Sequence, residues 1–192
     1  MASAQALSAR LIADARLGRA IAGHRLAPAP AVILIDGPSG SGKSTLADAL
    51  VSAWPGESAP QLIRLDDIYA GWRGLAAAGE HVTQNILEPL AAGLPARWQR
   101  YDWATGALAE WHAVDPSHPL VIEGCGVLTR SNAALADLAI WLDTDLAVRK
   151  ARALARDGDV YAPHWDDWQR QWEDFSAAED PAGLADILLD GS

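Results

Sequence analysis

Residues 31–45 read AVILIDGPSGSGKST. The first six, Ala31 to Asp36, form a short apolar run rich in β-branched residues, which is typical of a buried strand in a parallel sheet. The next eight, Gly37 to Ser44, match the pattern G-x-x-x-x-G-K-[ST]. Residues from Leu46 to Ala53 are mostly helix formers and stop before Pro55. The order strand, glycine-rich loop, helix is the context in which this pattern forms a phosphate-binding loop.

The loop from Gly37 to Thr45 is predicted to bind the phosphates of a nucleotide. Its glycines let backbone N–H groups surround phosphate oxygens, and the following helix points the positive end of its dipole at them. Lys43 supplies a mobile cation, and Ser44 supplies a hydroxyl ligand for Mg²⁺. A glycine- and serine-rich turn with an exposed lysine is the alternative. The predicted nucleotide-binding residues are Gly37, Ser39, Gly40, Ser41, Gly42, Lys43, Ser44 and Thr45.

Further apolar runs predict the rest of the fold. Strands are expected at Gln61–Leu65, Trp98–Trp103, Leu120–Glu123, Leu138–Asp143 and Ala185–Leu189, and helices at Thr83–Ala92, Asp145–Arg156 and Trp165–Phe175. Strands that alternate with helices indicate an α/β fold of the P-loop NTPase type, with three layers (α/β/α), a mostly parallel central sheet and a short lid.

The 192 residues suit a single P-loop domain, residues 1–192. Within it we expect an N-terminal helix in residues 1–28, ended by Pro28 and Pro30, and a short lid loop at residues 157–164. Leu7, Leu11, Leu17 and Ile21 would lie on one face of that first helix.

Composition argues against several classes of protein. Aspartate and glutamate exceed lysine and arginine by 25 to 15, and a net charge of −10 would repel a nucleic-acid backbone. No apolar stretch approaches the roughly 20 residues of a membrane-spanning helix, and the N-terminal region lacks the apolar core of a secretory signal. Cys125 is the only cysteine, which suits a reducing compartment. We expect a cytoplasmic protein without nucleic-acid or membrane partners; a homo-oligomer stays open.

Four further segments follow the loop in a set order. They are LDDIY (65–69), RYDW (100–103), VIEG (121–124) and LDTD (142–145), the last followed by Arg149, Arg152 and Arg156 at spacings that place them on one helical face. Together with IDGPSGSGKST, this ordered set resembles the uridine kinase-like family of P-loop kinases over roughly residues 31–157.

The resemblance implies a role for each matched residue. Asp66 would be the base that orients the acceptor hydroxyl, with Asp67 beside it, and Glu123 would join Ser44 in the Mg²⁺ shell. The arginines would contact the phosphates, Arg149 on the nucleotide and Arg152 and Arg156 with Lys43 on the transferring group. Tyr69, Tyr101 and Asp102 would contact the acceptor. Solvated acids at strand ends and a solvated basic helix face are the plainer alternatives.

The chain also departs from the family pattern. Thr105 and Gly106 stand where uridine kinases usually carry a histidine, which puts pyrimidine recognition in doubt, and the segment after Asp157 lacks the usual RGR. Trp72 and Trp103 flank the predicted acceptor residues and are candidates to stack on a planar substrate. The aromatic stripe of Trp165, Trp168, Trp172 and Phe175 is more typical of a core-facing helix.

These features predict an ATP- and Mg²⁺-dependent kinase that phosphorylates a hydroxyl of a nucleoside or similar small molecule. A nucleoside monophosphate kinase, or another small-metabolite kinase whose acceptor carries a phosphate, is the second reading, favoured if Arg97, Arg100 and Arg130 converge on the acceptor pocket. A regulatory protein that hydrolyses ATP slowly is the third, and it would need no acceptor base.

Overall fold

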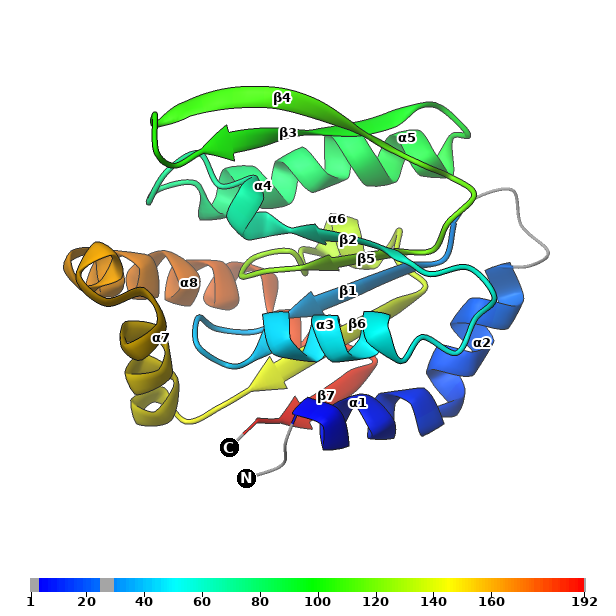
Figure 1. Cartoon of the computed structure of the whole chain (residues 1–192), viewed down its shortest axis with the longest axis horizontal. Coiled ribbons are helices and arrows are strands. Elements are labelled where there is room, and N and C mark those ends of the chain that lie inside the picture. Colours follow the sequence, from blue (N-terminus) through cyan, green and yellow to red (C-terminus); the bar gives the residue numbers. More distant parts are fainter. Residues whose placement is uncertain (1–3, 25–29, 192) are drawn as a thin grey trace.

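The computed structural model describes residues 4–24 and 30–191, and its centre is a parallel sheet. The five strands are β1 (Val32–Asp36), β2 (Gln61–Arg64), β5 (Leu120–Glu123), β6 (Leu138–Asp143) and β7 (Ile187–Asp190). Their order is β2-β5-β1-β6-β7, and all neighbours run parallel (Figure 1). The α/β fold with helices on both faces of a parallel sheet, expected from the sequence, is confirmed.

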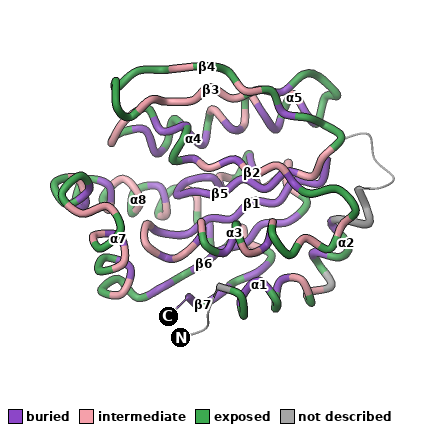
Figure 2. The backbone as a smooth tube through the Cα atoms, in the orientation of Figure 1, coloured by how far each residue is buried: buried purple, intermediate pink, exposed green. Residues whose placement is uncertain are grey.

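The central strand β1 separates two hydrophobic cores. Ile33 and Ile35 point to one face, where α1 (Ala4–Ala13), α2 (Ala15–His24) and α3 (Lys43–Ser52) cover the sheet. Val32 and Leu34 point to the other face, toward α4 (Leu75–Val82) and α8 (Trp165–Glu179). Every residue of β1 is buried, which explains its unbroken apolar sequence (Figure 2).

The first core includes the N-terminal residues. Leu7, Leu11 and Leu17 are buried as predicted, but two helices that meet at Asp14 replace the single expected one. The Asp14 carboxylate accepts from the Arg16 backbone N–H, so it satisfies a donor at the start of α2. The Ile21 side chain and the predicted end at Pro28 lie outside the described residues.

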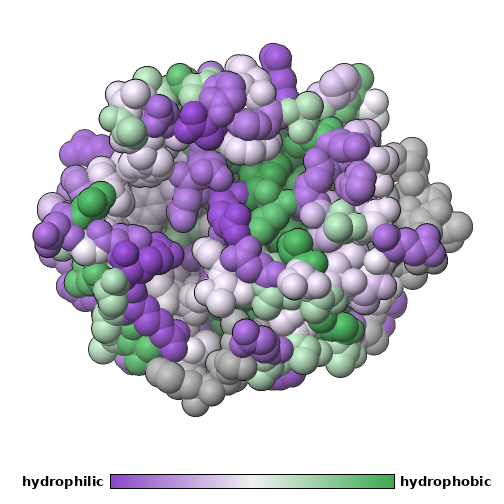
Figure 3. All heavy atoms as spheres, in the orientation of Figure 1, coloured by the Kyte–Doolittle hydropathy of each residue, from purple (hydrophilic) through white to green (hydrophobic). Residues whose placement is uncertain are grey.

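An antiparallel hairpin lies beyond the β2 edge of the sheet. It consists of β3 (Ala96–Asp102) and β4 (Ala107–Val114), and it packs on the π-helical turn η2 (Thr83–Leu87) that joins α4 to α5 (Glu88–Ala91). Strand β4 was missed in the sequence because most of its residues are exposed and so show no buried face. In the space-filling view, hydrophobic residues are exposed between the hairpin and α3, and hydrophilic residues surround them (Figure 3).

The predicted helix Thr83–Ala92 begins earlier than expected, because α4, η2 and α5 form one continuous helical segment from Leu75 to Ala91. Pro89 lacks the N–H that a regular helix would use. The π-helical turn directly before it changes the hydrogen-bond spacing and lets the segment continue past the proline.

The predicted lid loop is helical, so that part of the prediction is wrong. Helix α7 runs over Leu146–Tyr161 and is followed by the 3₁₀ turn η3 (Ala162–His164). A break inside α7 lies at Gly158, with φ 53° and ψ −132°. It separates the first part of α7 from most of the segment that was predicted to be the lid. The short helices α6 (Arg130–Ala133) and α9 (Pro181–Leu184) complete the chain. No helix among the described residues has the length and apolar character needed to cross a membrane.

Candidate active site

The carboxyl ends of the parallel strands bring the predicted site residues to one edge of the sheet. The phosphate loop follows β1, the 3₁₀ turn η1 (Leu65–Asp67) follows β2, and Gly124 follows β5. Between them lies a cavity of about 390 Å³. It is lined by Ser39, Gly40, Lys43, Ser44, Arg64, Asp66, Tyr69, Trp72, Trp103, Glu123, Gly124, Cys125, Arg156, Asp157, Tyr161 and Trp168.

The phosphate loop owes its shape to glycines. Gly40 has φ +79°, and a Cβ there would lie 2.0 Å from the backbone oxygen of Arg149. Only glycine fits this close approach of α7 to the loop. Gly42, at φ 103°, precedes the first turn of α3, so the helix N-terminus opens onto the loop.

Lys43 is buried at the floor of the cavity. Its Nζ donates to the Pro38 carbonyl at 3.1 Å and to Cys125 Sγ at 3.3 Å. Burial lowers the pKa of Lys43, but the acidic groups around it, including Glu123, outweigh that effect and raise the pKa above its usual value. The lysine is therefore a fixed cation at the loop.

Asp36, which sequence reasoning did not single out, ties the loop to the segment after β5. Its buried carboxylate accepts from the backbone N–H groups of Gly37 (2.6 Å), Gly126 (3.1 Å) and Leu128 (2.8 Å). Burial raises the pKa of Asp36 to about 6, against the opposing effect of these donors and of Lys43. The signal in the sequence was an acid at the end of an otherwise apolar strand.

Ser44 and Glu123, the two residues predicted to hold magnesium, both line the cavity. Glu123 is only 2% exposed, and its Oε1 accepts no hydrogen bond, although Arg64 Nε lies 3.6 Å from it. Burial raises the pKa of Glu123, while Lys43 and a hydrogen bond from Ser44 lower it. An orphaned carboxylate oxygen beside a hydroxyl suits Mg²⁺, which takes few protein ligands and keeps several waters. No cluster of three metal-ligating side chains occurs among the described residues.

Asp66 faces the same cavity from the end of β2. The Asp66 side chain is partly exposed to solvent in the cavity. The surrounding protein nevertheless desolvates its carboxylate and raises its pKa, while Lys43 and Arg156 lower it. The Trp103 indole donates to the Asp66 backbone carbonyl at 2.8 Å, so the hairpin holds η1 in place. Asp67 is exposed and does not line the cavity.

Aromatic side chains form part of the cavity wall. Trp72 stacks on Tyr161 (ring centroids 5.3 Å apart) and on His164 (4.4 Å), and it contacts Trp103 at 4.9 Å. The Tyr69 hydroxyl donates to the Cys125 carbonyl at 2.8 Å and is thus already engaged. Because Trp72 already stacks on two other rings, the prediction that it stacks on a planar substrate gains no support.

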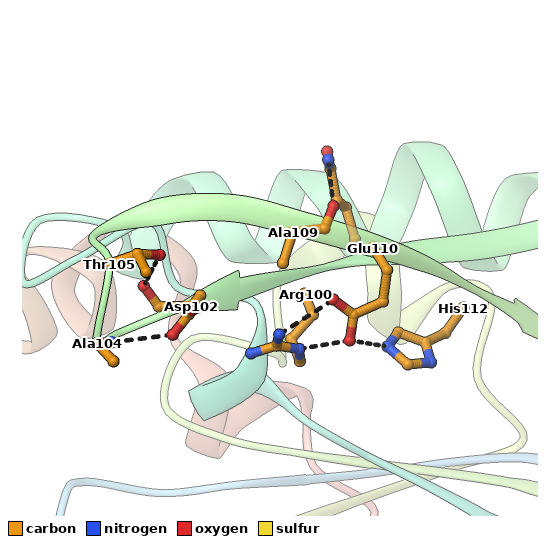
Figure 4. Close-up of polar contacts among 8 residues, drawn as sticks. Arg100, Asp102, Ala104, Thr105, Ala109, Glu110 and His112 are labelled. Carbon is orange, nitrogen blue, oxygen red and sulfur yellow. Dashed lines mark hydrogen bonds and ion pairs between the residues drawn. The ribbon is translucent and has the colours of Figure 1, made fainter.

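Two predicted substrate residues lie away from the cavity, in the hairpin. The Asp102 carboxylate accepts from the Ala104 N–H at 3.0 Å, and this contact shapes the turn between β3 and β4 (Figure 4). Tyr101 packs edge-on against Trp103 and does not line the cavity. The YD segment therefore supports the hairpin that carries Trp103.

The three predicted lid arginines point to different places. The Arg149 guanidinium is buried against Gln169 (2.8 Å) and over the rings of Trp165 and Trp172, and burial lowers its pKa. Arg152 and Arg156 instead line a cavity of about 260 Å³ that adjoins the phosphate loop. Arg149 lines a separate cavity of about 600 Å³ together with Pro38 of the loop, and its backbone approaches Gly40.

Comparison with solved structures agrees with this architecture. The fold superimposes on a protein described as a "possible uridine kinase" from Bacillus stearothermophilus with a TM-score of 0.59 and 21% identity, covering 84% of this chain and 89% of that one. It also superimposes on a "putative fructose transport system kinase" from Silicibacter sp. TM1040 with a TM-score of 0.62 and 20% identity, covering 97% and 98%.

The chain shares the three-layer α/β fold of these two structures, with a parallel sheet at its centre. At about 20% identity the likeness concerns the fold alone. No protein-family model and no curated protein sequence matches the chain. The case for function therefore depends on the site residues themselves.

Proposed function

We propose that the protein is an ATP-dependent kinase that transfers the terminal phosphoryl group of Mg²⁺-ATP to a hydroxyl of a nucleoside or similar small molecule. One observation carries the proposal: Asp66 lines the same cavity as Lys43 and Ser44 of the phosphate loop. A protein that only binds nucleotide has no need of a carboxylate at that place, and in a kinase this carboxylate can orient the acceptor hydroxyl.

In the proposed reaction, the cationic and acidic groups of the site have separate roles. The loop N–H groups and Lys43 would bind the nucleotide phosphates. Arg156, which is paired with Asp157, lines the same cavity and would stabilise the charge on the transferring group. As the acceptor oxygen forms its bond to the γ-phosphorus, the bond to the bridging oxygen of ADP breaks. The proton of the acceptor hydroxyl passes to the Asp66 carboxylate.

Ser44 and Glu123 would hold the magnesium ion, directly or through its water shell. When bound, Mg²⁺ neutralises phosphate charge and orients the phosphates. The orphaned Glu123 oxygen is the observation that supports this assignment.

The surroundings of Asp66 favour an acceptor that carries no phosphate. The arginines that would favour a nucleoside monophosphate lie elsewhere: Arg97 sits over Trp111, Arg100 pairs with Glu110 (Figure 4), and Arg130 pairs with Glu179. Aromatic rings occupy the acceptor end instead. The two similar structures bear the names of a uridine kinase and a fructose system kinase, and both names denote uncharged hydroxyl compounds.

The test is a phosphotransfer screen with Mg²⁺-ATP over nucleosides, nucleoside monophosphates, vitamins and sugars, with products identified by mass spectrometry. We expect a phosphorylated product whose rate of formation falls about 100-fold or more in Asp66→Asn, the usual range for losing a general base. Asp67→Asn makes the same chemical change next to the cavity and is expected to retain the rate.

Two outcomes contradict the proposal in different ways. Equal losses of rate in Asp66→Asn and Asp67→Asn would show that Asp66 has no role of its own in the reaction. Turnover of ATP without any phosphorylated product, unchanged in Asp66→Asn, would favour the regulatory ATPase instead.

A further inference from the structure

Tyr161 reaches the reaction cavity from the lid. It lies three residues beyond the Gly158 break in α7, and its side chain is 3% exposed. The lid segment, residues 157–164, reads DGDVYAPH and contains neither lysine nor arginine. Any contact that this segment makes with a nucleotide phosphate must therefore come from a neutral donor or from His164, and His164 stacks on Trp72.

The ring of Tyr161 is held in place on two sides. Trp72 lies parallel to it, with an interplanar angle of 9°, and Trp165 packs against it at 5.5 Å and 61°. These contacts involve only the ring, so they orient the hydroxyl without using it.

The hydroxyl itself is buried and has no hydrogen bond of standard geometry within the described part of the chain. Ser39 of the phosphate loop is close enough to lower the pKa of Tyr161 through hydrogen bonding, but burial dominates and the pKa is raised. The group therefore remains a neutral donor throughout the physiological range. Arg156 and Asp66 also act on it electrostatically, so it lies among the residues proposed for the reaction.

A buried donor without a partner is unfavourable unless a ligand satisfies it. Glu123 Oε1 is a second buried atom on the same cavity without a hydrogen bond, although it pairs with Arg64 at 3.6 Å. The Glu123 oxygen is an acceptor and the Tyr161 hydroxyl is a donor, which matches a metal ion on one side and a phosphate oxygen on the other.

We propose that the Tyr161 hydroxyl donates a hydrogen bond to the terminal phosphoryl group of the bound nucleotide, in the place where a lid cation would otherwise act. The inference rests on the proposed function, since it assumes a nucleoside triphosphate at the loop. It makes Tyr161 a catalytic residue supplied by the lid.

The test compares binding of Mg²⁺-ADP with binding of Mg²⁺-AMP-PNP, a non-hydrolysable ATP analogue, by isothermal titration calorimetry. Tyr161→Phe keeps both ring contacts and removes only the hydroxyl. We expect Kd for AMP-PNP to rise about 10-fold or more, as for loss of a hydrogen bond to a charged group, while Kd for ADP stays within about twofold. Tyr101→Phe, whose hydroxyl is outside the cavity, is expected to match wild type with both nucleotides.

Three results would overturn the inference. Unchanged Kd values for both nucleotides in Tyr161→Phe would mean that the hydroxyl does not contact the terminal phosphate. Equal weakening of both nucleotides would mean that it supports the fold of the site instead. Wild-type protein that binds neither nucleotide would overturn the proposed function as well, whereas normal binding without phosphotransfer would leave the Tyr161 contact standing and refute only the kinase reaction.

Discussion

Asp36 ends β1 as a buried carboxylate held by three backbone N–H groups. Two of the donors, Gly126 and Leu128, belong to the segment after β5, so one side chain joins two of the loops that surround the cavity. Such an acid is costly to ionise in the interior, and its pKa of about 6 reflects that cost.

The raised pKa predicts a pH dependence of stability. The folded-state pKa of Asp36, about 6, lies above the unfolded value of 3.8, so the folded state binds the proton more tightly. The resulting stabilisation is fully present below about pH 4 and is lost as pH rises through 6, by about 3 kcal/mol at most. Urea unfolding between pH 4 and 7 should show wild type losing this amount relative to Asp36→Asn, which cannot titrate.

Taking the difference between the two proteins cancels the other titrating groups and any constant cost of the substitution. Parallel stability curves would contradict the assignment. If the variant does not fold, the carboxyl carbon shift of Asp36 measured by NMR gives the pKa directly, and a midpoint near 4 would count equally against it.

At the scale of elements, the break at Gly158 changes the direction of the chain before residues 159–164, most of the segment predicted to be the lid. Helix α7 packs its backbone on Gly40 of the phosphate loop, and the chain then turns so that Tyr161 and His164 reach Trp72. At this turn Gly158 has φ 53° and ψ −132°, a backbone conformation that residues other than glycine rarely adopt.

We predict that Gly158→Ala lowers the free energy of unfolding by about 1–2 kcal/mol through backbone strain alone, because a Cβ at this position meets no atom within 4 Å. Gly18→Ala in α2 is the matched control: it has equal space and no positive φ, and should raise stability by about 0.5–1 kcal/mol. Chemical denaturation followed by tryptophan fluorescence measures both. A Gly158→Ala protein as stable as the control would show that the lid does not need this conformation.

At the scale of the whole molecule, the N-terminal helix α1 packs against α3, the helix that follows the phosphate loop. Leu7 and Leu11 of α1 share one core with Leu46 and Leu50 of α3, the helix that begins at the loop. Burial of these side chains against α3 stabilises the orientation of its N-terminus, where the phosphates are expected.

Leu11→Ala is predicted to lower the free energy of unfolding by about 2–5 kcal/mol, because Leu11 is 1% exposed and its removal leaves a cavity. Leu94→Ala removes the same atoms from a side chain that is 61% exposed and should change stability by less than about 0.5 kcal/mol. Urea denaturation of both variants against wild type tests the difference. Similar small losses in the two variants would mean that α1 is not an integral part of this core.

Much of the architecture could be predicted because the relevant signals are local. The strands β1, β5 and β6 are fully or almost fully buried, so each is a short continuous apolar run in the sequence. The phosphate loop is contiguous, and its glycines and Lys43 stand at a spacing that few other structures require. Parallel topology then brings Asp66 and Glu123 to the loop, because each follows the carboxyl end of a strand.

Tertiary structure alone decided the rest. Helical spacing could not show that the Arg149 guanidinium lies over Trp165 and Trp172 while Arg152 and Arg156 line a cavity beside the loop, since that depends on side chains of another helix. The same holds for Tyr161, which reaches the cavity through one glycine conformation and a stack on Trp72, 89 positions earlier in the chain. The sequence by itself determined the buried parallel strands and the phosphate loop, because burial and backbone geometry act over a few adjacent residues. Which side chains line the cavity was decided by contacts between distant segments, and no local pattern encodes them.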